Sequence, residues 1–228
     1  NDKGEYMMNL SSDTLALLKN FANINQNILI KPGKKLNTIS TMKNILATAD
    51  IKEDFDQQFA IYDLPEFLRT VDLFETPNLK FNGGSSVGIS GKDGRSQSKY
   101  TFADESVIVS PTKSISMPDT EVSFVFKKAD MERLMKGVVT LNLPDISVIG
   151  DGKNMILLAE DRKNKASNKF DIQVGETDKT FKAFFKAENF KMLADDYDVA
   201  ISKQKISHFV NRTRPVQYWI ALEPESEF

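Results

Sequence analysis

Apolar residues recur along this chain at two spacings, and the two spacings alternate. In four stretches they lie three or four positions apart, which predicts amphipathic helices. Between these stretches, short alternating or continuous apolar runs predict β-strands. The predicted helices cover residues 12–21, 64–74, 129–138 and 187–194. The order helix, strands, helix, strands therefore occurs twice, which favours an α+β protein built from two similar domains.

Local signals support these helices. Ser11, Ser12 and Asp13 are good N-caps for the first helix, and Asp63 followed by Pro65 suits the start of the second. Three phenylalanine-led strands, beginning at Phe59, Phe124 and Phe181, each run into a predicted helix. Chance recurrence in an ordinary α+β protein is the alternative, but the return of the whole order makes a repeat the better interpretation.

The predicted strands are short and closely spaced, as in antiparallel sheets. One pair is marked by a Gly150-Asp-Gly-Lys153 turn, whose Asp-Gly pair is typical of a hairpin. We expect strands at residues 27–31, 36–42, 45–51, 59–62, 79–81, 86–89, 99–102, 122–126, 146–149, 155–159, 170–174, 181–185, 197–201, 206–211 and 216–222.

A stretch of different amino-acid composition separates the two halves of the chain. Residues 107–121 carry Pro111 and Pro118 among small polar residues, which predicts an extended connector, with Val107–Val109 able to add an edge strand. We therefore expect an N-terminal domain over residues 8–106 and a C-terminal domain over 122–228. Residues 1–7 lack apolar periodicity and are expected to be an extension outside the fold.

Composition narrows the possible chemistry. The 228 residues include no cysteine and one histidine, His208, so thiolate catalysis and cages of cysteine or histidine ligands are excluded. No apolar run approaches the roughly 20 residues of a membrane helix, and no leader resembles a signal peptide. A net charge of −2 argues against nucleic-acid binding by bulk electrostatics. We expect no cofactor, no metal and no membrane partner.

Two patterns resemble catalytic sites but fit poorly. The glycine-rich stretch at residues 83–93 places Ser86 and Asp93 where a phosphate loop needs a glycine and a Ser or Thr, so turn glycines are the better interpretation. Two acidic clusters could hold metals in a nuclease, although Asp in a turn commonly bonds the local backbone. They are Glu53, Asp54 and Asp56, and Asp195, Asp196 and Asp198. We expect a packing or surface role for His208.

The distribution of basic residues is more informative than their number. The predicted helices and the strand ends before them carry cations on their polar sides, with a local surplus of two around the third helix and again around the fourth. One interpretation is a shared helix face that approaches phosphates, and the other is a solvated surface. The candidates are Lys19, Lys128, Arg133, Lys136, Lys186 and Lys191.

Four segments and the terminal Phe228 resemble the DNA polymerase sliding clamp of T-even-type tailed phages. The segments are residues 15–25, 59–64, 109–118 and 218–223, and the similarity runs in order from about Met8 to Phe228. The resemblance implies the DNA clamp fold, with two helices per domain packed on antiparallel sheets, and a homotrimer closed into a ring. Lys19, Lys136 and Lys191 match basic family positions on helices lining the hole. Arg69 departs from the family pattern, so the resemblance assigns it no DNA role.

The resemblance also implies a mechanism and partners. The ring would encircle double-stranded DNA without sequence preference and tether the replicative polymerase without catalysis. An ATP-dependent clamp loader and late-transcription factors would be further partners, in the cytoplasm of an infected bacterial host. Partner peptides would enter a pocket between the domains, for which the candidates are Ile108, Val109, Pro111, Leu222 and Pro224, unless these residues pack the domain junction. A protein-binding adaptor without DNA and a metal-dependent nuclease are the alternatives.

Overall fold

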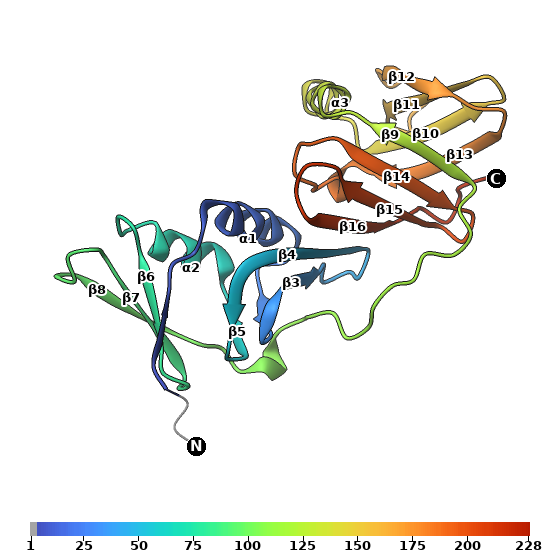
Figure 1. Ribbon diagram of the computed structural model, residues 1–228. Coiled ribbons are helices and arrows are strands. Elements are labelled where there is room, and N and C mark those ends of the chain that lie inside the picture. Colours follow the sequence, from blue (N-terminus) through green and yellow to red (C-terminus); the bar gives the residue numbers. More distant parts are fainter. Residues whose placement is uncertain (1–3) are drawn as a thin grey trace. The chain divides into compact units, whose positions relative to one another are not determined.

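The chain divides into two compact units between Lys113 and Ser114, inside the expected connector. The structure is a computed structural model that describes residues 4–228, and Figure 1 follows the elements along the chain. The expected edge strand at Val107–Val109 is wrong. Residues Glu105–Val107 form a 3₁₀ turn, η1, because the Asp104 carboxylate accepts a hydrogen bond from the Ser106 N–H and caps it.

Two helices of the first unit begin where the sequence predicts. Helix α1 (Ser12–Ile24) is capped by Ser11, whose hydroxyl accepts from the Thr14 N–H at 3.2 Å. Helix α2 (Leu64–Val71) is capped by Asp63, whose carboxylate accepts from the Glu66 N–H at 2.9 Å. Each helix buries one apolar stripe, and the two helices pack side by side. Helix α1 also packs on β3 (Gly33–Ile39) and β4 (Ile45–Phe55) (Figure 1).

The strands of the first unit form one four-stranded sheet and two antiparallel pairs. The sheet has the order β1-β6-β7-β8 and is antiparallel throughout. Its strands are β1 (Tyr6–Met8), β6 (Asn78–Phe81), β7 (Ser86–Ser90) and β8 (Gln97–Thr101). The pairs are β2 (Ile28–Ile30) with β5 (Phe59–Ile61), and β3 (Gly33–Ile39) with β4 (Ile45–Phe55).

Strand β1 corrects the expectation that residues 1–7 lie outside the fold. Tyr6 pairs with Phe81, and their rings stack with centroids 4.8 Å apart. An aromatic ring buries more apolar area than most side chains, so Tyr6 contributes to the core of this unit. The first three residues of the predicted extension lie outside the described part of the chain.

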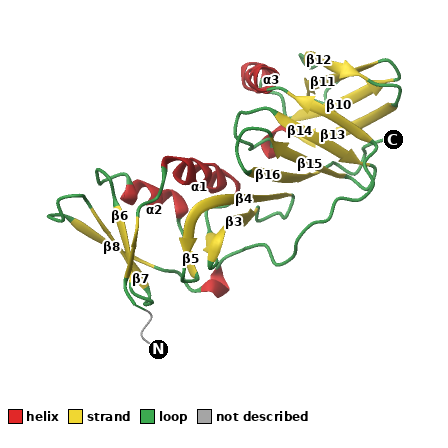
Figure 2. Cartoon of the chain, viewed as in Figure 1, coloured by secondary structure: helices red, strands yellow, loops and turns green. Residues whose placement is uncertain are grey.

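The second unit contains two antiparallel four-stranded arrays and one α-helix. The first array has the order β9-β14-β15-β16 and the second β12-β11-β10-β13. Helix α3 (Lys128–Leu141) packs on β11 and β12 (Figure 2). The strands are β9 (Val122–Phe126), β10 (Asp145–Asp151), β11 (Asn154–Glu160), β12 (Phe170–Glu176), β13 (Thr180–Lys186), β14 (Tyr197–Ser202), β15 (Ile206–Asn211) and β16 (Val216–Ala221).

The fourth predicted helix is wrong. Only the 3₁₀ turn η2 (Ala187–Asn189) forms, and the chain then runs without regular structure to β14. Two buried tyrosines hold this segment by its backbone: the Tyr197 hydroxyl donates to the Leu193 carbonyl at 2.6 Å, and the Tyr218 hydroxyl accepts from the Leu193 N–H at 3.2 Å. Both backbone groups of Leu193 are therefore bonded outside a helix, and the C-terminal domain has one α-helix where two were expected.

Each unit has its own aromatic core. Phe55, Phe59 and Phe81 meet in the first unit, with ring centroids 5.3 to 6.2 Å apart. Phe185, Phe190 and Phe209 meet in the second, at 5.3 to 6.3 Å. Each half of the chain thus buries an apolar cluster of its own. Across residues 4–228, none of the helices has the length and apolar character needed to cross a membrane.

Candidate nucleic-acid interface

Lys19 lies on the solvent side of α1. The buried stripe of this helix includes Leu17, Leu18 and Phe21, and helical geometry places Lys19 on the side opposite Phe21. Its Nζ lies 3.6 Å from an Asp72 carboxylate oxygen at the end of α2, and both side chains are about half exposed. Such an exposed ion pair is weak, so Lys19 can exchange its carboxylate for another anion.

The outward face of α2 carries both charges. Arg69 and Glu66 lie on the side opposite Leu64 and Leu68. The Tyr100 hydroxyl donates to Glu66 at 3.1 Å, and burial together with this carboxylate raises the pKa of Tyr100 to about 12. With Glu66 and Asp72 beside it, Arg69 does not make this helix basic.

Helix α3 presents the most basic of the helix faces. Arg133 and Lys136 lie opposite the buried Met131, Leu134 and Val138, while Lys128 sits at the first position. Lys128 pairs with Glu132 at 3.9 Å, and among residues 4–228 no ion pair involves Arg133 or Lys136. The unburied sides of this helix therefore hold three cations against two carboxylates, Asp130 and Glu132, a surplus of one positive charge that suits anionic ligands.

The start of α3 depends on a residue far away in the sequence. Lys127 precedes the helix and supplies no side-chain cap. The Asp196 carboxylate accepts instead from the Lys128 N–H at 2.7 Å and also complements the positive end of the helix dipole. This acidic residue thus orients the cations of α3.

Lys186 and Lys191 do not lie on a helix. Lys186 ends β13, and its Nζ lies 3.7 Å from a Glu223 carboxylate oxygen. Lys191 lies in the irregular segment after η2, where its N–H bonds the Asn189 carbonyl. Both side chains are exposed. Lys186 lies at a strand end as expected, but the fourth helix that it would lead into does not form, so the expected position of Lys191 on that helix is wrong.

The five residues predicted for partner peptides fall in different units. Ile108, Val109 and Pro111 are partly exposed in the first unit, where the Val109 carbonyl accepts from Asn25 at 3.0 Å. Leu222 is buried and Pro224 exposed in the second unit, where the Pro224 carbonyl accepts from the Lys205 ammonium. A single pocket formed by all five stays a prediction.

Both acidic clusters are divided among structural roles. Glu53 is buried on β4 and accepts from the Ser11 hydroxyl at 3.1 Å, while Asp54 and Asp56 point to solvent. Asp195 bonds Arg214 at 3.1 Å and Asn211 at 2.9 Å. Asp198 lies 3.8 Å from Arg212. Within residues 4–228, no group of three or more acidic or histidine side chains is arranged to hold a metal ion.

His208 and the glycine-rich stretch have packing and turn roles. The His208 ring stacks on Trp219 with centroids 4.5 Å apart and bonds the Gln217 amide oxygen at 2.7 Å. Burial lowers the pKa of His208. Gly83 has φ +77, which a turn glycine adopts readily, and much of residues 83–93 is β7 and its flanking turns.

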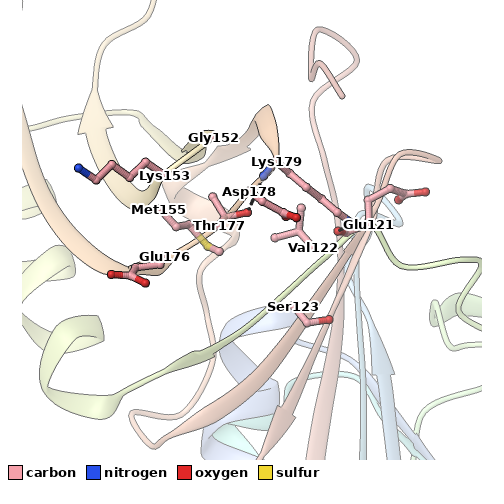
Figure 3. A pocket seen from close by; sticks show the side chains of 10 residues that line it. All are labelled: Glu121, Val122, Ser123, Gly152, Lys153, Met155, Glu176, Thr177, Asp178 and Lys179. Atoms are coloured by element: carbon pink, nitrogen blue, oxygen red, sulfur yellow. Dashed lines mark hydrogen bonds between the residues drawn. The ribbon is translucent and has the colours of Figure 1, made fainter.

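One hollow of about 510 Å³ lies in the second unit near the start of β9. Figure 3 shows Lys179 extending toward Glu121, while Lys153 and Glu176 point away from that side. The Lys179 ammonium donates to the Glu121 backbone carbonyl, so this cation fastens the chain locally.

A basic loop between β11 and β12 was missed in the sequence. Arg162, Lys163, Lys165 and Lys169 fall within eight residues, and that density was the available signal. The Arg162 guanidinium carbon lies 4.0 Å from the centre of the Phe184 ring. No sequence spacing predicts this contact, because Phe184 belongs to another strand.

Solved structures resemble the chain over nearly its whole length. The proliferating cellular nuclear antigen of Entamoeba histolytica superposes with a TM-score of 0.71 at 12% identity, covering 98% of this chain and 100% of that one. The PCNA of Thermococcus kodakaraensis gives 0.64 at 14% identity, with coverage of 96% and 99%. At this identity the likeness establishes the clamp fold.

Sequence comparison identifies the family. The family model "DNA polymerase processivity factor" matches residues 11–110, and "gp45 sliding clamp, C terminal" matches residues 120–224. The sliding clamp of Vibrio phage KVP40 is 34% identical over 95% of this chain and 99% of its own length. That of Enterobacteria phage T4 is 30% identical, over 96% and 98%. The chain belongs to the sliding-clamp family of T4-like phages, the DNA polymerase processivity factors.

Proposed function

We propose that three copies of this chain close into a ring around double-stranded DNA and tether the replicative polymerase. A duplex threaded through a closed ring cannot leave sideways, so retention is topological and no strong local bond is needed. Contacts to phosphates carry no sequence information, which suits a protein that must travel along any sequence.

The observation that carries this proposal is the solvent side of α3. It holds Lys128, Arg133 and Lys136 against Asp130 and Glu132 in a chain whose net charge is −2. An acidic protein with a locally basic helix face can attract a polyanion there without binding it over its whole surface. Lys19 on α1 is proposed to serve in the same way, with Lys186 and Lys191 as further phosphate contacts from irregular backbone.

Free sheet edges support the trimer. Among the described strands, β8 pairs only with β7, and β12 only with β11. Open edges invite pairing with another chain, and pairing between two different edges closes into a ring when the rotation permits it. We propose that β8 of one copy meets β12 of the next.

The remaining partners follow from the same role. An ATP-dependent loader would open and close the ring, and the polymerase and late-transcription factors would dock through short peptides. We propose Ile108, Val109, Pro111, Leu222 and Pro224 as the peptide pocket. The protein itself would act without catalysis, in the cytoplasm of the infected bacterium.

Retention on DNA tests the proposal. After loading, the protein should persist on nicked circular DNA and be lost from linear DNA of the same sequence, because only open ends release a threaded ring. Arg133→Glu with Lys136→Glu should reduce loading and polymerase stimulation at least tenfold, since both substitutions place repulsive charge on α3.

A matched control isolates the helix face. Lys153→Glu with Lys203→Glu makes the same charge change at two exposed turn lysines of the same unit, and should retain activity within about twofold. Equal retention on circles and linear DNA would contradict encirclement, and a protein that stimulates polymerase without DNA retention would be an adaptor. Magnesium-dependent digestion of the DNA would instead indicate a nuclease.

A further inference from the structure

A second hollow of about 610 Å³ lies on the face of the β12-β11-β10-β13 sheet opposite α3. Phe170 contacts Gly137 of α3, which fixes the helix side of this sheet. Strand alternation then places Leu158, Ile149 and Phe184 on the other side, where they form a partly exposed apolar floor.

The rim of this hollow is basic. Four cations and two carboxylates line it, a surplus of two positive charges. Lys169 already pairs with Glu160 at 3.3 Å. No ion pair within residues 4–228 involves the other three cations, Arg162, Lys165 and Lys182.

Arg162 is held ready to bind an anion. Its guanidinium stacks on Phe184, which fixes the plane of the group. Its Nε is buried and has no hydrogen-bond partner among the described residues. A fixed guanidinium with unused donors suits a carboxylate, which can accept two parallel hydrogen bonds.

The loop that carries Arg162 is shaped by hydrogen bonds within it and by one to Asp145 of β10. The Asp161 carboxylate accepts from the Lys163 N–H at 3.1 Å, and the Arg162 N–H donates to Asp145 at 2.8 Å. The Asn164 side chain accepts from the Ala166 N–H at 3.0 Å. A preformed loop loses little conformational freedom when a ligand binds.

We propose that this hollow binds a short acidic peptide with one bulky apolar side chain, presented by a protein partner. The apolar floor would take the bulky side chain, while Arg162, Lys165 and Lys182 would meet the carboxylates. A duplex fits less well, because phosphates offer nothing apolar to cover Leu158 and Phe184. The proposal does not depend on ring closure or on the cations of α3.

Fluorescence anisotropy with the full chain tests it directly. The probe is a labelled 12-residue peptide of Asp and Glu with a central Leu, compared with one whose acids are Lys and one whose Leu is Ala. Only the first should bind well, the Ala peptide at least fivefold more weakly, and 0.3 M NaCl should weaken binding further.

Variants locate the binding site. Arg162→Gln and, separately, Lys182→Gln should each weaken binding of the acidic peptide, the first at least tenfold. Lys203→Gln, in the turn between β14 and β15, should change the affinity less than twofold. Thermal unfolding checks that each variant is folded. Retention of Arg162→Gln on circular DNA should stay normal, which separates this site from the DNA-binding role.

Four results would overturn the proposal. The first is equal binding of the acidic and basic peptides, and the second is affinity unaffected by both Arg162→Gln and Lys182→Gln. The third is displacement of the peptide by duplex or single-stranded DNA at lower concentration than by unlabelled peptide, which would assign the hollow to nucleic acid. The fourth is a lower mass of the assembly in Arg162→Gln by light scattering, which would assign it to a second copy of the chain.

Discussion

Asn25 joins three parts of the first unit through one side chain. Its amide nitrogen donates to the Ile39 carbonyl at 2.9 Å and to the Val109 carbonyl at 3.0 Å, and its oxygen accepts from the Asn27 N–H at 2.8 Å. The residue is only 5% exposed. The end of α1, strand β3 and the chain leaving this unit are therefore fastened at one point.

Replacing this side chain should be costly. Asn25→Ala leaves one N–H and two carbonyls of partly buried residues without this partner, and should lower the free energy of unfolding by about 2 to 3 kcal/mol. Urea denaturation measures the loss. Asn23→Ala, at an exposed position of the same helix, should stay within about 0.5 kcal/mol. Equal losses in the free energy of unfolding for the two substitutions would contradict the role assigned to Asn25.

The two buried tyrosines make stability depend on alkaline pH. Burial raises the pKa of Tyr218 to about 12 and also raises that of Tyr197. The unfolded chain releases tyrosine protons near pH 10, whereas the folded chain keeps them. The stabilisation is complete below about pH 10 and falls as the pH rises toward 12, by about 2 to 3 kcal/mol for Tyr218 alone.

Thermal unfolding by circular dichroism at pH 9 to 12 measures this dependence, with tyrosinate absorbance as a second signal. Tyr218→Phe should be less stable at pH 9, because the Leu193 N–H loses its acceptor, but should lose less stability with rising pH. A wild-type melting temperature that stays constant to pH 12 would contradict the assignment.

At the scale of elements, the sequence predicted those helix starts that depend on capping residues next to the helix. Three helices begin at or within a residue of their expected starts, since Ser11 and Asp63 cap the helices that directly follow them. The fourth failed because the Tyr218 hydroxyl that bonds Leu193 comes from 25 positions along the chain. Strand β1 was not predicted because a strand of three residues is too short to show an alternating pattern of apolar residues.

The candidate site could likewise be predicted only where it depends on local sequence. Exposure of Lys19, Arg133 and Lys136 followed from helical spacing, as did the balanced charges around Arg69. The cap that Asp196 provides to α3, across 68 positions, and the stack of Arg162 on Phe184 depend on tertiary contacts. Such contacts cannot be read from the spacing of residues in one chain.

Gly137 shows tertiary packing outweighing helix propensity. A Cβ at this position of α3 would lie 2.7 Å from Cγ of Phe170. Gly137→Ala should gain about 1 kcal/mol of helix propensity, yet lower overall stability by about 1 to 3 kcal/mol because Phe170 must move.

Urea denaturation shows whether Gly137→Ala raises or lowers the free energy of unfolding. The control is Thr140→Ala, at an exposed position of the same helix, which should be neutral or slightly stabilising because nothing packs there. A gain in stability from Gly137→Ala would show that the helix and β12 are free to separate.

At the scale of the whole molecule, the chain contains two units, each with its own hydrophobic core. We propose that three such chains assemble into a trimer. Light scattering should give a mass of three chains of 25.7 kDa, about 77 kDa, falling toward one chain on dilution. A trimer is expected because pairing between two different strand edges, β8 of one copy and β12 of the next, leaves an edge free on each end until several copies close the ring. A mass of one chain at every concentration would contradict the trimer.

The ion pairs of the proposed DNA-facing lysines bear on how such a ring would move. Lys19, Lys128 and Lys186 each have a carboxylate within 4 Å. In the proposed complex, a lysine that releases one phosphate returns to its own acid before meeting the next, so neither state is deeply trapped. At these three lysines the friction against the duplex would then be low, which would favour fast one-dimensional diffusion along the DNA.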